Sequence, residues 1–246
     1  MTNRGTARIG ILVPFTNTNL EQDMMMLAPA GASLHFTRIG GYDEDEIPDE
    51  DQMEGLGAAN IEEPLHLLQG ARPDVILYGC TSATLAHGPS FDRELATKIK
   101  SHSGVQTVTA AGGLVAALRS LQVSRIGFAS PYVAALNDRA IGFLADEGFE
   151  TVSRAAIGEA LGNDEQGALA PDAVFELGRR ANSPDAQAIV LSCTDMRSVE
   201  VIDQLEQSLG KPVVTSNQAM MFQTLRMLGI SDVPSGFGQL FDKVAP

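Results

Sequence analysis

Short apolar runs rich in β-branched residues alternate along the chain with segments whose apolar residues recur every three or four positions. The runs lie at residues 9–13, 34–39, 75–78, 106–109, 126–129, 151–155, 188–192 and 213–215. Helical spacing is clearest at residues 114–121 and 220–228. Buried strands that lack polar alternation and are separated by helices are typical of parallel α/β folds. We therefore predict an α/β fold of parallel sheets flanked by helices.

The chain also repeats itself. RIGILVP at residues 8–14 resembles RIGFASP at 125–131, and VILYGCT at 75–81 resembles AIVLSCT at 188–194. A third pair is VT at 108–109 and 214–215, which is followed further along the chain by LR, at 118–119 and 225–226. Three matches in the same order indicate duplication. We predict two lobes related by a pseudo-twofold axis, each a four-stranded parallel sheet, with the active site between them. The first lobe spans residues 1–115, completed by residues 217–246, and the second spans 116–216.

The repeat places the two cysteines, Cys80 and Cys193, just after equivalent strands. Ligands of open parallel sheets bind beyond the carboxyl ends of strands, so the pseudo-twofold brings both thiols into one cleft. A lone cysteine at such a position is more often a small buried hydrophobe. The duplicated Cys-Thr step favours a site instead. Neither cysteine has a second Cys or His at ligand spacing, so no metal site is predicted.

Two thiols on opposite sides of one carbon suit two kinds of chemistry. One thiolate can remove a proton next to a carboxylate while the other thiol delivers a proton to the opposite face. Alternatively, a thiolate can add covalently to an activated double bond. Backbone N–H groups after each strand, at Thr81-Ser82 and Thr194-Asp195, can hold a carboxylate or a developing oxyanion. Neither chemistry requires a cofactor.

The composition and the net charge limit which ligands and which cellular location are expected. The formal net charge of −14 argues against nucleic acid and anionic membranes as ligands. The apolar run near the N-terminus is too short for a signal peptide, and Pro14 interrupts it. Together with two cysteines that form free thiols in a reducing compartment, this predicts a cytoplasmic protein. The acidic run at residues 43–51 is interpreted as a solvated loop.

Several motifs together resemble the aspartate/glutamate racemase superfamily. They are VPFTNT at residues 13–18, YGCTSA at 78–83, ASPY at 129–132, SCT at 192–194 and PVVTSNQA at 212–219. The resemblance covers essentially the whole chain. It is strongest for the branch of maleate cis-trans isomerases, arylmalonate decarboxylases and ectoine-utilisation proteins.

The resemblance implies site residues. Cys80 takes the place of the nucleophilic cysteine, and Cys193 that of the second cysteine, which exchanges a proton. Asn17, Tyr132 and Asn163 take the places of groups that hold the substrate carboxylates. A homo-oligomer and a small carboxylate or dicarboxylate substrate are also implied.

Two departures from maleate isomerases keep alternatives open. This chain has Thr81 and Ser82 where those enzymes usually have apolar residues, and Phe15-Thr16 where they tend to have two serines. Arylmalonate decarboxylases, by contrast, have glycine in place of the first cysteine. The leading hypothesis is a cofactor-independent two-cysteine isomerase of the maleate type. The alternatives are an amino-acid racemase of the aspartate, glutamate or ectoine-derived diamino acid type, a decarboxylase, and a non-catalytic carboxylate-binding protein.

Overall fold

The computed structural model describes residues 5, 7–41 and 43–244, and its strands form two parallel sheets. The first sheet contains β1 (Ala7–Pro14), β2 (Ala32–Ile39), β3 (Val75–Tyr78) and β4 (Gln106–Thr109). The second contains β5 (Arg125–Ser130), β6 (Glu150–Ala156), β7 (Ala188–Leu191) and β8 (Val213–Thr215). Their orders, β2-β1-β3-β4 and β6-β5-β7-β8, are equivalent. The predicted α/β fold with two four-stranded lobes is confirmed.

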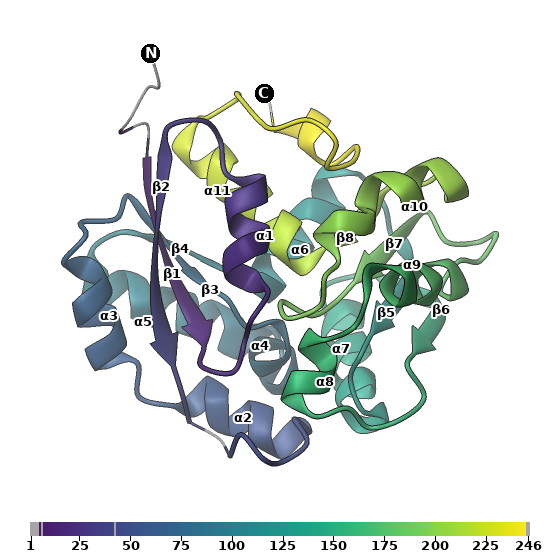
Figure 1. The fold of residues 1–246 in the computed structure, drawn as a ribbon, viewed down its shortest axis with the longest axis horizontal. Coiled ribbons are helices and arrows are strands. Elements are labelled where there is room, and N and C mark those ends of the chain that lie inside the picture. The colour runs from purple at the N-terminus through teal and green to yellow at the C-terminus, as the bar shows by residue number, and fades with distance from the viewer. Residues whose placement is uncertain (1–4, 6, 42, 245–246) are drawn as a thin grey trace.

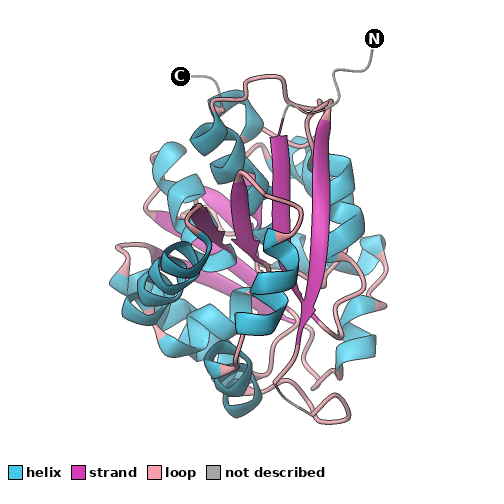
Figure 2. Cartoon of the chain, turned by 90° about the vertical axis from the view of Figure 1, so that its left-hand side faces the viewer, coloured by secondary structure: helices cyan, strands magenta, loops and turns pink. Residues whose placement is uncertain are grey.

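Helices lie on both faces of the sheets (Figures 1 and 2). Those from the first part of the chain are α1 (Leu20–Leu27), α2 (Glu50–Ala58), α3 (Glu62–Gln69), α4 (Thr81–His87), α5 (Pro89–Ser103) and α6 (Ala110–Ser120). The later ones are α7 (Ala134–Asp146), α8 (Asn163–Gly167), α9 (Pro171–Arg180), α10 (Ile202–Leu209) and α11 (Ser216–Leu228), with the short 3-10 helices η1 (Val199–Val201) and η2 (Phe241–Lys243). No described helix has both the length and the apolar character that a bilayer span requires.

The interior strands supply the centre of each core. Every residue of β3 and β7 is buried, because helices cover both faces of these short apolar runs. The outer strands β2 and β6 are mostly half-buried. The carboxyl ends of β1, β3, β5 and β7, where the predicted site residues follow, therefore have a rigid apolar base.

The C-terminal part of the chain contacts both lobes. Helix α11 packs against α6 and α1 (Figure 1). Beyond it, the Gln239 N–H donates to the Glu206 carboxylate of α10, 2.9 Å away. The division at residues 115 and 116 stays a prediction, and residues 1–4, 6, 42 and 245–246 of the proposed first lobe lie outside the described part of the chain.

Candidate active site

Cys80 and Cys193 line the same small cavity between the lobes. Cys80 follows β3 by two residues and Cys193 follows β7 by two residues, so equivalent strand ends of the two sheets deliver the thiols. The cavity has a volume of about 40 Å³, room for a few water molecules at most. Its lining residues are Pro14, Thr16, Asn17, Pro48, Met53, Leu56, Cys80, Ser82, Asn163, Gln166, Cys193, Thr194 and Asp195.

Hydrogen-bond donors surround the Cys80 sulfur. The chain turns directly from Cys80 into α4, and the backbone N–H groups of Ser82 and Ala83 face the sulfur. The Ser82 hydroxyl lies 3.6 Å from it and can turn to donate to it, although it also reaches the Met53 sulfur at 3.0 Å. Burial raises the pKa of Cys80, and the Asp195 carboxylate adds to the rise, whereas these donors lower it. The donors make Cys80 the thiol whose ionised form is better stabilised.

Fewer donors face Cys193. The Asp195 backbone N–H donates to its sulfur at 3.3 Å. The side-chain oxygen of Gln166 lies 3.9 Å from the sulfur and accepts from the thiol. Burial raises the pKa of Cys193 strongly and the Asp195 carboxylate raises it further, while the Asp195 N–H and the Tyr132 hydroxyl lower it. At neutral pH Cys193 is therefore a protonated thiol.

Thr194 ties the two lobes together beside the thiols. Its hydroxyl donates to the Gly79 carbonyl at 2.9 Å and accepts from the Asn17 side-chain amide at 3.1 Å. The Asn17 side-chain oxygen in turn accepts from the N–H groups of Asn19 and Leu20, so it holds the turn that leads into α1. Asn17 thus reaches the cavity wall and orders this turn at the same time.

The hydrogen bonds of Thr194 to Gly79 and Asn17 form a bridge between the lobes, and at Gly79 this bridge requires a residue without a side chain. The Gly79 N–H donates to the Leu12 carbonyl at 2.8 Å, and a Cβ there would lie 2.8 Å from the same carbonyl and overlap Leu20. No residue with a side chain fits without displacing its neighbours. The close approach sets the position of Cys80, the next residue.

Asp195 joins the second lobe to the loop before α1. One carboxylate oxygen accepts from the Thr18 N–H at 2.8 Å, the Asn19 N–H at 3.0 Å and the Asn19 side-chain amide at 3.1 Å. Burial raises the pKa of Asp195 to about 6, although these hydrogen bonds lower it. Asp195 is charged at neutral pH and holds its negative charge close to both thiols.

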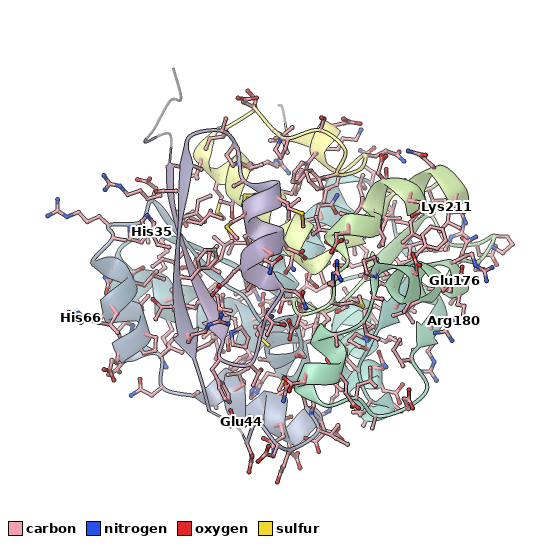
Figure 3. The ribbon with its side chains drawn as sticks, viewed as in Figure 1. His35, Glu44, His66, Glu176, Arg180 and Lys211 are labelled. Atoms are coloured by element: carbon pink, nitrogen blue, oxygen red, sulfur yellow. The ribbon has the colours of Figure 1, made fainter. Side chains whose placement is uncertain are left out.

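Asn163 lies at the start of α8 and lines the cavity. Its amide donates to the Glu44 carbonyl at 3.2 Å, and its side-chain oxygen accepts from Thr16 at 3.4 Å. Figure 3 shows Glu44 at the outer edge of the molecule, near α2. The acidic run at residues 43–51 is thus in contact with the site, and its Pro48 lines the cavity.

Tyr132 and Thr81 lie beside the cavity rather than in its lining. Tyr132 is buried, and its hydroxyl lies 3.4 Å from Ser192, which precedes Cys193. Its pKa is raised well above the usual value, first by burial and then by the proximity of Cys193 and, less strongly, Cys80, whose ionised forms would repel a phenolate. Thr81 is buried and its hydroxyl has no hydrogen-bond partner.

None of the described residues that line the cavity is cationic, and Asp195 is the one carboxylate among them. A carboxylate ligand must therefore be held by neutral donors. The described residues also contain no group of three or more His, Cys, Asp or Glu side chains placed to hold a metal ion. His35 and His66 lie far out on the first lobe (Figure 3).

Comparison with known proteins identifies the family. The arylmalonate decarboxylase family model matches residues 10–241. The chain belongs to this family. A maleate isomerase of Nocardia farcinica is 29% identical to this family member over 96% of both chains. An arylmalonate decarboxylase of Bordetella bronchiseptica is 27% identical over 94% of this chain and 92% of its own. The branch predicted from the sequence motifs is confirmed.

Solved structures of the family show the same fold. A cysteine-to-serine mutant of the Nocardia farcinica maleate cis-trans isomerase, with a covalently bound succinylcysteine intermediate, gives a TM-score of 0.86 at 26% identity, covering 96% of this chain and 98% of its own. An arylmalonate decarboxylase gives a TM-score of 0.76 at 26% identity, covering 96% and 99%.

Three polar residues that line the cavity, Thr16, Gln166 and Asp195, are not among the site residues predicted from the sequence, and Gln166 and Asp195 contact Cys193. For Asp195 the sequence predicts a role of the backbone N–H in the turn after Cys193, and it gives no indication of the role of the carboxylate. Gln166 carried no signal at all, because it lies on a short helix outside the repeated motifs.

Proposed function

We propose that this chain is a cofactor-independent isomerase that converts maleate to fumarate through Cys80 and Cys193. The observation that carries the proposal is the pair of thiols lining one cavity from equivalent positions in the two lobes. The maleate isomerases among the relatives support it, as does the succinylcysteine adduct bound to one of them. The presence of Cys80 argues against decarboxylation, since the resemblance implies glycine there in decarboxylases.

Burial raises the pKa of both thiols, so Cys80, whose thiolate has more donors around it, must first release its proton to solvent while Cys193 keeps its own. The Cys80 thiolate forms a C–S bond to one alkene carbon, and the π electrons move to the other alkene carbon and its carboxylate. Cys193 delivers its proton to that second carbon. The new single bond rotates, the Cys193 thiolate takes the proton back, and breakage of the C–S bond re-forms the double bond in the trans geometry.

Neutral donors hold the two carboxylates in this proposal. Asn17, Asn163 and Ser82 line the cavity and have amide or hydroxyl donors, and the backbone N–H groups around Thr81 and Thr194 add to them. Tyr132 is assigned the same role from beside the cavity wall. Because the cavity measures only about 40 Å³, binding of a dicarboxylate requires it to widen.

Turnover and trapping test this function. The wild-type protein is expected to convert maleate to fumarate, and Cys80→Ala to lose roughly 10³-fold or more of the rate. Cys193→Ser is expected to accumulate protein heavier by one maleic acid, with the added mass on the peptide that contains Cys80. Thr107→Val, in β4 and outside the cavity lining, is the folding control.

A panel of other substrates defines the outcomes that contradict the proposal. Loss of the α-hydrogen of aspartate or a diamino acid to deuterated water, with maleate unchanged, would identify a racemase. Carbon dioxide released from an arylmalonate would identify a decarboxylase. Tight binding of maleate without turnover, unaffected by Cys80→Ala, would identify a binding protein.

A cytoplasmic location and a homo-oligomer belong to the same proposal. Two unpaired cysteines are compatible with a reducing compartment. Light scattering coupled to size-exclusion chromatography measures the oligomer, and a mass equal to one chain, 26.0 kDa, would contradict that part of the proposal.

A further inference from the structure

Gln166 reaches the cavity from α8 and is almost completely buried, with 7% of its surface exposed. Its side-chain nitrogen donates to the Leu161 carbonyl at 3.1 Å. A carbonyl only accepts hydrogen bonds, so the nitrogen of the amide must face Leu161 and the oxygen must face the other way. That oxygen lies 3.9 Å from the Cys193 sulfur.

The fixed amide therefore presents an acceptor to Cys193. An acceptor favours the thiol, whose S–H can point at it, and disfavours the thiolate, which would face the negative end of the amide dipole. The amide cannot turn to solvate a thiolate without giving up its bond to Leu161. Among the described residues, Cys193 is the one donor that reaches the Gln166 side-chain oxygen.

The other charged and titratable groups around Cys193 are Asp195, Cys80 and Tyr132. Asp195 acts in the same direction as Gln166, because its carboxylate also opposes a second negative charge. The Asp195 carboxylate also accepts hydrogen bonds from the backbone of Thr18 and Asn19, so a substitution of Asp195 would disturb the loop before α1 as well as Cys193. Gln166 has no such second task at the lobe interface, so its effect on Cys193 can be tested separately.

We propose that Gln166 is a positioning residue that keeps Cys193 protonated and aims its S–H before proton transfer to the substrate. This rests on the proposed function, in which Cys193 delivers a proton while Cys80 forms the C–S bond. A purely structural glutamine would need only the bond to Leu161. The orientation of the oxygen toward Cys193 is what assigns the additional role.

The first test needs no substrate. In a Cys80→Ala background Cys193 is the single cysteine, and its alkylation by iodoacetamide is followed by intact mass across pH. Gln166→Leu is expected to lower the alkylation midpoint by about one pH unit, the size of one lost hydrogen bond to the thiol. Gln166→Glu retains an acceptor, so its midpoint is expected at or above that of the parent. Gln187→Leu, exposed near the amino end of β7, is the control and should not move it.

The second test uses the protein with both cysteines. Gln166→Leu is expected to lower kcat for maleate roughly 10- to 100-fold with KM within about 3-fold, since the proton donor is misaimed while substrate contacts remain. An alkylation midpoint that stays or rises in Gln166→Leu, or falls in Gln166→Glu, would overturn the proposal. So would a higher KM at unchanged kcat. If Gln166→Leu fails to fold, Gln166→Glu decides alone. If wild type does not turn over maleate, the proposed function fails, and the alkylation test still decides the role of Gln166.

Discussion

Asp23 is a buried carboxylate whose replacement should make the protein more stable. It lies on α1 with 2% of its surface exposed, and it accepts one hydrogen bond, from the Asn217 side-chain amide at 2.7 Å. Burial raises its pKa to about 7, although the Asn217 bond lowers it. Glu200 and Asp195 raise it further, and Arg197 lowers it. The buried oxygen of Asn217 has no hydrogen-bond partner.

The sign of the pH dependence is set by the raised pKa. Folded protein holds the Asp23 proton up to about pH 7, whereas the unfolded chain releases it near pH 4. Between these values the folded state binds more protons, so this group favours folding at low pH and the contribution is lost as pH rises through 7. The ionised group costs roughly 4 kcal/mol at pH 8.

Asp23→Asn removes that cost and keeps a side-chain oxygen that can accept the hydrogen bond from Asn217. We expect it to raise the free energy of unfolding by roughly 2 to 4 kcal/mol at pH 8 and by little at pH 4. Urea denaturation at four pH values from 4 to 8 measures this. Asp92 titrates alike in both proteins and cancels in the difference between the two curves. Asp195 is coupled to Asp23, but burial is the largest cause of the raised pKa of Asp23, so the Asp23 contribution dominates the difference.

Asp232→Asn makes the same charge change at an exposed site and is the control. It is expected to shift stability by less than about 0.5 kcal/mol at every pH. A gain in Asp23→Asn that is the same at pH 4 and pH 8, or a loss at pH 8, would refute the reasoning.

Two further predictions concern the bridge between the lobes. Thr194→Val should lower the free energy of unfolding by roughly 2 to 4 kcal/mol, because the Gly79 carbonyl and the Asn17 amide both lose a buried partner. Thr107→Val, whose buried hydroxyl has no partner, should leave the free energy of unfolding unchanged or raise it by about 1 kcal/mol in the same urea titration; a loss equal to that of Thr194→Val would contradict the role of the bridge. Gly79→Ala should cost roughly 1 to 3 kcal/mol and slow maleate turnover, because the new Cβ collides with the Leu12 carbonyl; wild-type stability and rate would contradict this.

Sequence patterns predicted the strands well because the strands are buried on both faces. All eight predicted runs overlap observed strands, and those at 75–78, 106–109 and 213–215 agree at both ends. β1 and β2 are each two residues longer at the start than predicted, since Ala7 and Ala32 pair with each other without an apolar signal in the sequence. An apolar run marks the part of a strand that is buried in the core, but it does not mark the residue at which backbone pairing with the neighbouring strand ends.

Strand ends indicated most of the predicted residues that line the cavity, and Asn163, which also lines it, was indicated only by the family resemblance. Cys80, Cys193, Asn17, Ser82 and Thr194 all line the cavity. Thr81 does not, because successive residues of a helix point in directions about 100° apart and Thr81 and Ser82 are its first two residues. The sequence placed both Thr81 and Ser82 on the turn after the strand and did not indicate which of the two faces the cavity.

The repeated Cys-Thr step predicts two equivalent thiols, but the chain takes a different course after each one and makes them unequal. After Cys80 the chain enters α4, so N–H groups and the Ser82 hydroxyl face the sulfur. After Cys193 no helix begins until η1, and the residues that gather there are an aspartate and the oxygen of a glutamine. Donors stabilise a thiolate, while an acceptor and a negative charge stabilise a thiol. A duplicated scaffold thus holds two sulfurs in equivalent places, and the unrepeated residues around them make Cys80 easier to ionise than Cys193, which is the order that addition to a double bond requires.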